Sequence, residues 1–190
     1  MIRGWRVNLR PVSVHDLPHM VKWRRDMRLM GYYDRPVPIS PDEMEIEIRD
    51  HIKSPDRLDF IVESKKGEPL GPAFFEHIDR ESRHGEINIM IAEKKRGAAF
   101  HGANSAFLLL LYAFRKMNLR KVYGRIIEYA SESRALLEAV GFKKEAVWRE
   151  YFYQKGRRWD FHVYGLLRDD FERFLKTPRG RRYLKASGEK

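Results

Sequence analysis

One stretch of the sequence places small residues, basic residues and a helix start in an order that suits binding of a phosphate group. Residues 85–114 begin with an apolar run typical of a strand, Ile87–Ala92, and end with a long apolar run at helical spacing, Ala103–Phe114. A basic turn, KKRGAA at 94–99, joins them. The first N–H groups of a helix lack backbone partners, and the helix dipole favours negative charge there. The stretch predicts a phosphate or pyrophosphate site, with an ordinary strand-to-helix turn as the alternative.

Two familiar phosphate-binding motifs are absent from the sequence. It contains neither Gly-x-x-x-x-Gly-Lys-Ser/Thr nor Gly-x-Gly-x-x-Gly. The phosphate site is therefore not expected to be a P-loop or part of a dinucleotide-binding fold.

The composition indicates a single domain without cysteine. A chain of 190 residues can bury a sizeable core, so we expect one domain over residues 1–175 and a basic, flexible tail over 176–190. Because cysteine is absent, disulfides, thiol catalysis and thiolate metal sites are excluded, and the chain fits a reducing compartment such as the cytoplasm. The first ten residues lack an apolar signal segment, and the longest apolar run is too short to cross a membrane.

The net charge of +11 favours a negatively charged binding partner. Such a charge permits nucleic-acid binding, although the basic residues are scattered apart from the C-terminal end. An anionic substrate or cofactor would use the same field. A basic nucleic-acid-binding protein therefore remains an alternative at this point.

Local patterns predict an α+β fold. The expected helices are Ser13–Arg28, 40–52, Ala103–Phe114, Ser131–Val140 and Asp169–Lys176, and the expected strands are Val7–Arg10, Leu58–Val62, Gly71–Ile78, Ile87–Ala92, Lys121–Ile127, Phe142–Tyr153 and Trp159–Leu167. This order predicts a mixed, mostly antiparallel central sheet with helices on both faces. The strand–helix–strand unit over 87–127 requires one parallel pair.

Three stretches resemble the GNAT superfamily of N-acetyltransferases, in its RimJ/RimL-like branch of ribosomal-protein-alanine and spermidine acetyltransferases. Val7–Pro11 followed by His15-Asp16-Leu17 resembles the opening strand and helix of that branch. Lys94-x-x-Gly97-x-Ala99 resembles the pyrophosphate turn of the superfamily. Ser133–Phe142, followed by Trp159-Asp160 and Tyr164–Leu167, resembles the C-terminal block. The order and spacing of the three stretches together are specific.

The resemblance implies a GNAT-like fold, acetyl-CoA as cofactor and acetyl transfer to an amine. The strand backbone would pair with the pantetheine arm, and the following turn would hold the pyrophosphate. The cofactor-binding residues that it implies are Ile89, Met90, Ile91, Lys94, Arg96, Gly97, Ala98, Ala99, Phe100, His101, Gly102, Ser131 and Arg134. Three positions depart from the pattern: Lys94 stands where the family has Gln or Arg, Ala130 where many relatives have Asn, and Leu137 where many have a Tyr that protonates the leaving thiolate.

Acetyl transfer needs a base for the amine and a donor for the carbonyl oxygen. Glu86, at the head of the fourth strand, matches a glutamate that acts as base in some relatives, although it could instead simply pair with a basic neighbour. Backbone N–H groups near Met90 and Ile91 are the expected oxyanion donors. Ser133 corresponds to a serine near the sulfur in this branch, or serves only as a first-turn hydroxyl.

The acceptor site is predicted from the resemblance and from residue type. The loop 31–39 and the last hairpin would wall it, with Tyr32, Tyr33, Asp34 and Tyr151 as substrate-binding residues. Protein N-termini, polyamines, amino sugars and small amines all remain open as acceptors, and a homodimer is a family-level expectation. A non-catalytic acyl-CoA-binding protein is a second alternative. No metal site is expected, because the histidines show no ligand spacing with a carboxylate on one helix.

Overall fold

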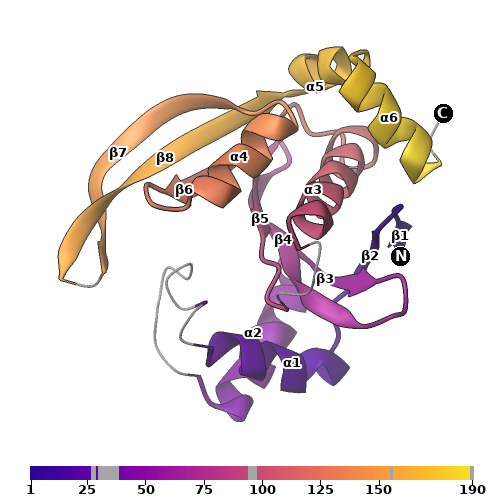
Figure 1. Cartoon of the computed structure of the whole chain (residues 1–190). Coiled ribbons are helices and arrows are strands. Elements are labelled where there is room, and N and C mark those ends of the chain that lie inside the picture. Colours follow the sequence, from indigo (N-terminus) through magenta and orange to yellow (C-terminus); the bar gives the residue numbers. More distant parts are fainter. Residues whose placement is uncertain (27–28, 30–38, 94–97, 155, 189–190) are drawn as a thin grey trace.

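The structure is a computed structural model, and it describes residues 1–26, 29, 39–93, 98–154 and 156–188. Eight strands form one sheet in the order β1-β2-β3-β4-β5-β6-β8-β7 (Figure 1). The strands are β1 (Ile2–Arg3), β2 (Val7–Pro11), β3 (Leu58–Ser64), β4 (Pro69–Asp79), β5 (His84–Ile89), β6 (Lys121–Ile127), β7 (Lys143–Gln154) and β8 (Arg157–Leu167). The helices are a 3-10 turn η1 (Val14–Asp16), α1 (Leu17–Arg24), α2 (Pro41–Lys53), α3 (Ala98–Arg115), α4 (Ser131–Ala139), α5 (Arg168–Leu175) and α6 (Pro178–Ser187).

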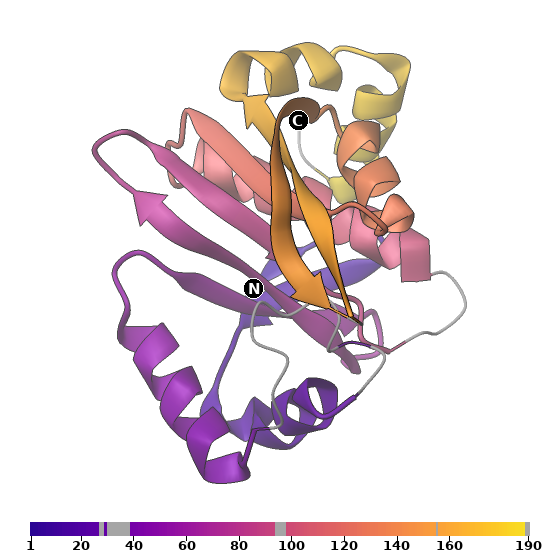
Figure 2. The same ribbon diagram turned by 90° about the vertical axis from the view of Figure 1, so that its left-hand side faces the viewer.

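Alternation along β3 separates the two faces of the sheet. Phe60 and Val62 belong to the main core with α3 and α5, whereas Ile61 packs with Trp23 of α1 in a separate cluster. Successive side chains of a strand point to opposite faces, so α1 and α3 cover opposite faces. Figure 2 shows α1 and α2 at the opposite end of the molecule from α5 and α6, with strands between them. The predicted α+β sheet with helices on both faces is confirmed.

The pair β5–β6 is parallel, whereas every other neighbouring pair is antiparallel. Its pairing runs only from His84↔Lys121 to Glu86↔Tyr123. Beyond this point β5 stays paired with β4 and β6 stays paired with β8, as far as Ile127↔Phe161. The sheet is therefore parted between β5 and β6 from Glu86 onward.

Helix α1 is shorter than predicted, and strand β4 contains a proline. Helix α1 ends at Arg24 rather than at the predicted Arg28, and Arg25 is its C-cap. Strand β4 runs straight through Pro72, a residue that has no N–H to donate to a neighbouring strand. The Pro72 carbonyl faces β5, where it accepts from the Met90 N–H, and the N–H that proline lacks would face the same side. The pairing of β4 with β3 is therefore unaffected.

The segment 176–190 was predicted to be a flexible tail, but most of it forms helix α6. Thr177 accepts a hydrogen bond from the Gly180 N–H as the N-cap, and Pro178 occupies the first helical position. The Tyr183 ring packs against Trp5 and Phe107, with ring centroids 5.1 and 5.2 Å apart. Because these aromatic contacts bury one face of the segment, it folds back on the main core despite its basic composition. None of the helices that the structure describes is both long and apolar enough to cross a membrane.

Candidate active site

The edge of β5 beyond Glu86 carries backbone groups that face the gap in the sheet. The Met90 N–H donates to the Pro72 carbonyl at 3.0 Å, and the Ala92 N–H donates to the Leu70 carbonyl at 2.8 Å. Because backbone groups of an antiparallel strand alternate in direction, the N–H groups of Ile89 and Ile91 point away from β4 and toward β6. Ile89 and Ile91 are therefore placed to pair with an extended ligand. Of the two expected oxyanion donors, only Ile91 remains, since the Met90 N–H already has an acceptor.

The path of β5 depends on a close approach at Gly71. A carbon atom added to Gly71 would lie 1.9 Å from the Met90 carbonyl oxygen and 2.9 Å from the Ala92 backbone nitrogen. Any larger side chain would push the end of β5 away from β4. Glycine at this position therefore lets the end of β5 stay close to β4, and this position of β5 sets the width of the gap between β5 and β6.

The start of α3 lies against the end of β5 and against α4. Within its first turns are five predicted cofactor residues, namely Ala98, Ala99, Phe100, His101 and Gly102. A carbon atom added to Gly102 would lie 3.5 Å from Leu136 of α4 and 3.8 Å from Ile91. The structure thus brings the helix start and the β5 edge together. Lys94, Arg96 and Gly97 lie outside the described residues.

The His101 side chain offers an observation that fits a ligand at this helix start. Its Nδ1 atom is buried and has no hydrogen-bond partner among the described residues. Burial and the nearby charge of Arg6 both lower the pKa of His101, so the neutral ring is favoured. A buried ring nitrogen without a partner is costly in the free protein, and a bound polar group would offset that cost.

Helix α4 covers the gap from the α3 side. Leu137 is buried, and a carbon atom added to Gly124 of β6 would lie 3.4 Å from it. Ser133 lies one turn earlier on the same helix face, so it is placed over the wider part of the gap. Arg134 instead lies on the β8 side, where burial, Lys144 and Arg134 together lower the pKa of His162. Ser131 is exposed in the first turn of α4.

On the α1–α2 face, Glu86 sits at the point where the strands part. Its carboxylate is almost fully buried, at 2% exposure, and accepts from Arg125 Nε at 2.6 Å. Its other oxygen lies 3.2 Å from His77 Nδ1. Glu76, directly opposite on β4, accepts from Arg57 at 2.8 Å and from Asn88 at 2.9 Å. The structure therefore places Glu86 in a polar network rather than alone.

A bulge in β4 explains why the consecutive residues Glu76 and His77 both lie beside the Glu86 carboxylate. The β4–β5 register shifts between Glu76 and Asp79, and His77 has a left-handed backbone with φ of 51°. Adjacent strand residues would otherwise point to opposite faces. The bulge turns the His77 ring toward Glu86, on the face that Glu76 occupies.

Burial changes the proton affinities in this network. Burial raises the pKa of Glu76, and the Glu86 charge adds to the rise, against the opposing effect of Arg57. Burial and the Glu86 charge also raise the pKa of Tyr123. Ligand atoms of Glu76, His77 and Glu86 lie within 4.8 Å of one another. Two arginines, Arg57 and Arg125, already supply positive charge to the carboxylates. The network is therefore suited to proton transfer and amine contact rather than to holding a metal ion.

Four residues of this network were not among the predicted site residues: Glu76, His77, Tyr123 and Arg125. The alternation of polar and small or apolar residues along 121–127 was a usable signal, because it predicts one polar face for β6. Tyr151 connects to this face through one neighbour. The Arg125 guanidinium lies 5.9 Å from the Trp148 ring, which lies 5.0 Å from the Tyr151 ring. Tyr32, Tyr33 and Asp34 lie outside the described residues.

Comparisons with known proteins agree with this geometry. Residues 6–143 match the family model for the acetyltransferase (GNAT) domain. The uncharacterized N-acetyltransferase p20 of Bacillus licheniformis is 24% identical over 87% of this chain and 95% of its own. The uncharacterized N-acetyltransferase YoaA of Bacillus subtilis (strain 168) is 27% identical over 53% of this chain and 56% of its own.

A solved structure shows the same architecture with ligands bound. The spermidine N-acetyltransferase from Vibrio cholerae, in complex with CoA and spermine, aligns with a TM-score of 0.82 and 26% identity. The alignment covers 87% of this chain and 98% of that one. Since the family match extends over most of the chain and includes the parted strands and the start of α3, the chain belongs to the GNAT acetyltransferase family and is an acetyl-CoA-dependent N-acetyltransferase.

Proposed function

We propose that the chain transfers an acetyl group directly from acetyl-CoA to a primary amine, within one ternary complex, across the gap between β5 and β6. The observation that carries this proposal is the end of β5–β6 pairing at Glu86 and Tyr123. The gap has α3 and α4 on one side and the Glu86 network on the other. Donor and acceptor can therefore meet from opposite faces of the sheet, which supports direct transfer.

The donor side has groups suited to each part of acetyl-CoA. The free N–H groups in the first turn of α3 would bind the diphosphate, together with the helix dipole. The backbone of Ile89 and the carbonyl of Ile91 would pair with the pantetheine arm, which leaves the Ile91 N–H for the thioester. Ser133 would lie near the sulfur. When bound, acetyl-CoA supplies the activated acyl group as a thioester.

On the acceptor side, we assign Glu86 the role of base, acting through a water molecule. The amine loses a proton, its nitrogen forms a bond to the carbonyl carbon, and the carbon–sulfur bond breaks. Arg125 and His77 fix the Glu86 carboxylate, and each oxygen keeps a second lone pair for water. The Ile91 N–H stabilises the carbonyl oxygen as charge develops on it. Leu137 provides no proton, but a thiol with a pKa of about 8.5 leaves readily as a thiolate.

The acceptor is a primary amine, and its class can be identified by assaying a panel of different amines. We place the chain in the RimJ/RimL-like branch, whose acceptors include protein N-termini and polyamines, and Tyr151 with Trp148 would contact the amine-bearing molecule. The similarity to a spermidine N-acetyltransferase supports including polyamines in the panel. Release of CoA thiol should be measured with spermidine, an alanine-initiated peptide and an amino sugar.

The expected result is amine-dependent thiol release with at least one member of the panel. Mass spectrometry should then show one added acetyl group on that amine. A protein that binds acetyl-CoA but acetylates none of the amines would instead be an acyl-CoA-binding protein, and the proposal would be wrong.

Two further expectations concern the setting of the enzyme. A cysteine-free chain suits the reducing cytoplasm.

A second copy of the chain would pack on the β7–β8 hairpin, which extends away from the body of the molecule and exposes Tyr151 and Tyr153 (Figure 1). Sedimentation of the wild type and of a Tyr151→Ser/Tyr153→Ser variant tests the homodimer, since a monomeric wild type would exclude it.

A further inference from the structure

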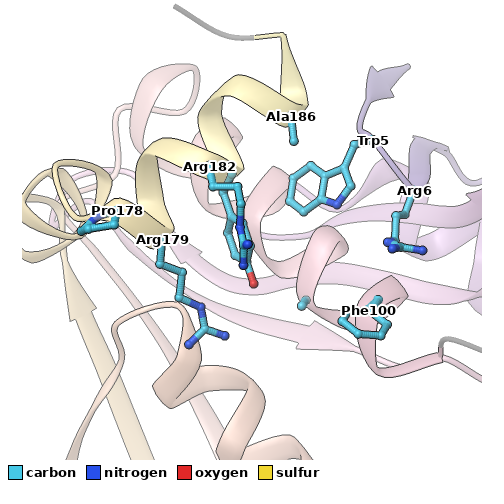
Figure 3. A pocket seen from close by; sticks show the side chains of 9 residues that line it. Trp5, Arg6, Phe100, Pro178, Arg179, Arg182 and Ala186 are labelled. Carbon is cyan, nitrogen blue, oxygen red and sulfur yellow. The ribbon is translucent and has the colours of Figure 1, made fainter.

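A pocket of about 870 Å³ lies between the start of α3 and helix α6, outside the gap described above. Figure 3 shows the aromatic Trp5 and Phe100 facing the basic Arg179 and Arg182 of α6 across it. Tyr183 and Arg6 complete its wall. The volume lies within the range of about 300–1,000 Å³ that is usual for small-molecule sites.

The charges that line this pocket are all positive. Arg6, Arg179 and Arg182 are its only charged lining residues, and none of them forms an ion pair with a carboxylate among the described residues. Guanidinium groups bind phosphate through paired, charge-assisted hydrogen bonds. The pocket is therefore suited to an anion, and phosphate is one of the groups whose geometry the arginine fork matches.

The pocket also offers aromatic surface to a flat ring. Phe100, in the first turn of α3, is 61% exposed, and the Arg6 guanidinium lies 5.0 Å from its ring centroid. Exposed aromatic rings beside arginine are the usual platform on which a nucleobase stacks. A ligand that combines a base with a phosphate would use both features.

Both walls of the pocket are fixed in place. Arg179, Arg182 and Tyr183 follow the spacing of one helical face, and Tyr183 is packed between Trp5 and Phe107. A carbon atom added to Gly180 would lie 2.1 Å from the Phe174 carbonyl, so α6 packs closely on the end of α5. On the opposite wall, Asn104 of α3 accepts from the Arg6 N–H at 2.8 Å. The pocket is thus preformed rather than dependent on a ligand.

We infer that this pocket binds the adenosine 3′-phosphate end of acetyl-CoA, with Arg179 and Arg182 holding the phosphate and Phe100 the adenine. The inference rests on the proposed binding of the diphosphate at the start of α3. The ribose follows the diphosphate directly in CoA, and Phe100 and Ala103 of the same helix turns line the pocket. The family match ends at residue 143, so α6 adds this subsite to the shared domain.

The test compares binding of CoA with binding of dephospho-CoA, which lacks only the 3′-phosphate, by isothermal titration calorimetry. The wild type should bind CoA at least about tenfold more tightly, as expected for a phosphate held by two arginines. Arg179→Gln/Arg182→Gln should remove most of this difference by weakening CoA alone. Phe100→Ala should weaken both ligands equally, because both contain adenine.

A matched control removes two charges from the same helix without altering the pocket. Arg181→Gln/Lys185→Gln lowers the net charge equally, and neither residue lines the pocket, so the preference for CoA should persist. Equal affinities of the wild type for CoA and dephospho-CoA would overturn the inference and leave the proposed function intact. Failure to bind either ligand would overturn both. Loss of the preference in the control as well would show a general charge effect and overturn the inference.

Discussion

At the scale of single residues, the role of Glu86 decides whether the polar network on the α1–α2 face takes part in catalysis or only stabilises the fold. It is buried at the point where the strands part, and both of its oxygens contact basic groups. A carboxylate held in this way could accept a proton through water, or it could simply balance the charge of Arg125. The two roles differ in their effect on the dependence of rate on pH.

Replacing Glu86 by Gln should lower kcat by about 100-fold, the usual contribution of a general base. The loss should be largest at low pH, where most of the amine is protonated, and smaller at high pH, where the amine loses its proton unaided. Profiles of kcat against pH for the variant and for a Glu172→Gln control on α5 measure this. An unchanged profile would remove Glu86 from the mechanism.

Asp16 shows how one carboxylate fixes the entry of the chain into α1. It accepts from Arg10 at 2.5 and 2.7 Å and from the Ser13 N–H at 2.9 Å. Burial acts to raise the pKa of Asp16, but the hydrogen bonds from Arg10 and Ser13 outweigh it and hold the pKa below the ordinary value of 3.8. The Ser13–Asp16 capping box was predictable from the sequence, whereas the contact with Arg10 of β2 required the fold.

Asp16→Asn should lower the free energy of unfolding by roughly 1.5–3 kcal/mol at neutral pH, the range for hydrogen bonds to a charged group. Because the folded pKa is depressed, this contribution is present above the unfolded pKa of 3.8 and is lost as the pH falls through the lower folded pKa. Urea unfolding at pH 7 and at pH 3 measures it. A difference between variant and wild type that stays constant down to pH 3 would contradict the assignment.

At the scale of elements, the course of β5 depends on its contact with β4. The end of β5 is held by hydrogen bonds to the carbonyls of Leu70 and Pro72. Gly71, between them, leaves room for the Met90 carbonyl. Since the other edge of this segment faces the gap, a shift of β5 would alter the surface offered to acetyl-CoA.

Gly71→Ala should therefore raise the KM for acetyl-CoA and lower the melting temperature, because the added carbon would lie 1.9 Å from the Met90 carbonyl oxygen. Gly85→Ala on the neighbouring strand β5 is the control, since its added carbon would meet its nearest neighbours at an ordinary 3.5 Å. Steady-state kinetics and thermal melts of both variants make the comparison. Equal effects at the two positions would show that the contact at Gly71 does not position β5.

Most of the elements were predictable from local patterns, because each has a strong local signal. Strand β6 was predicted with its observed limits, and α2 lies within one residue of the predicted range 40–52 at each end. Helix α6 was missed because its many basic residues hid a short packing face formed around Tyr183, although Thr177-Pro178 was a readable helix start. The Glu76–His77–Glu86 network could not be predicted, because it depends on a bulge and on the pairing of distant strands.

At the scale of the whole molecule, the net charge of +11 and the arginine-lined pocket would both attract the same anionic ligand, acetyl-CoA. A positive field raises the rate at which anions arrive, and salt screens it over about 10 Å at 0.1 M. Attraction of acetyl-CoA would account for this charge without nucleic acid as a partner.

The KM for acetyl-CoA should rise several-fold between about 0.05 and 0.5 M salt, while kcat stays nearly constant, because screening weakens association rather than chemistry. An uncharged acetyl thioester without phosphates serves as the control, and its KM should not change. If the KM for acetyl-CoA were also insensitive to salt, the charge of the molecule would have no role in binding this ligand.

The most direct measurement is a crystal structure of the protein grown with CoA. The account predicts the pantetheine arm between β5 and β6, hydrogen-bonded to the backbone of Ile89 and Ile91, with its sulfur between Ser133 and the Glu86 side of the gap. CoA bound elsewhere, or a gap closed by continued pairing of β5 with β6, would contradict the proposed site.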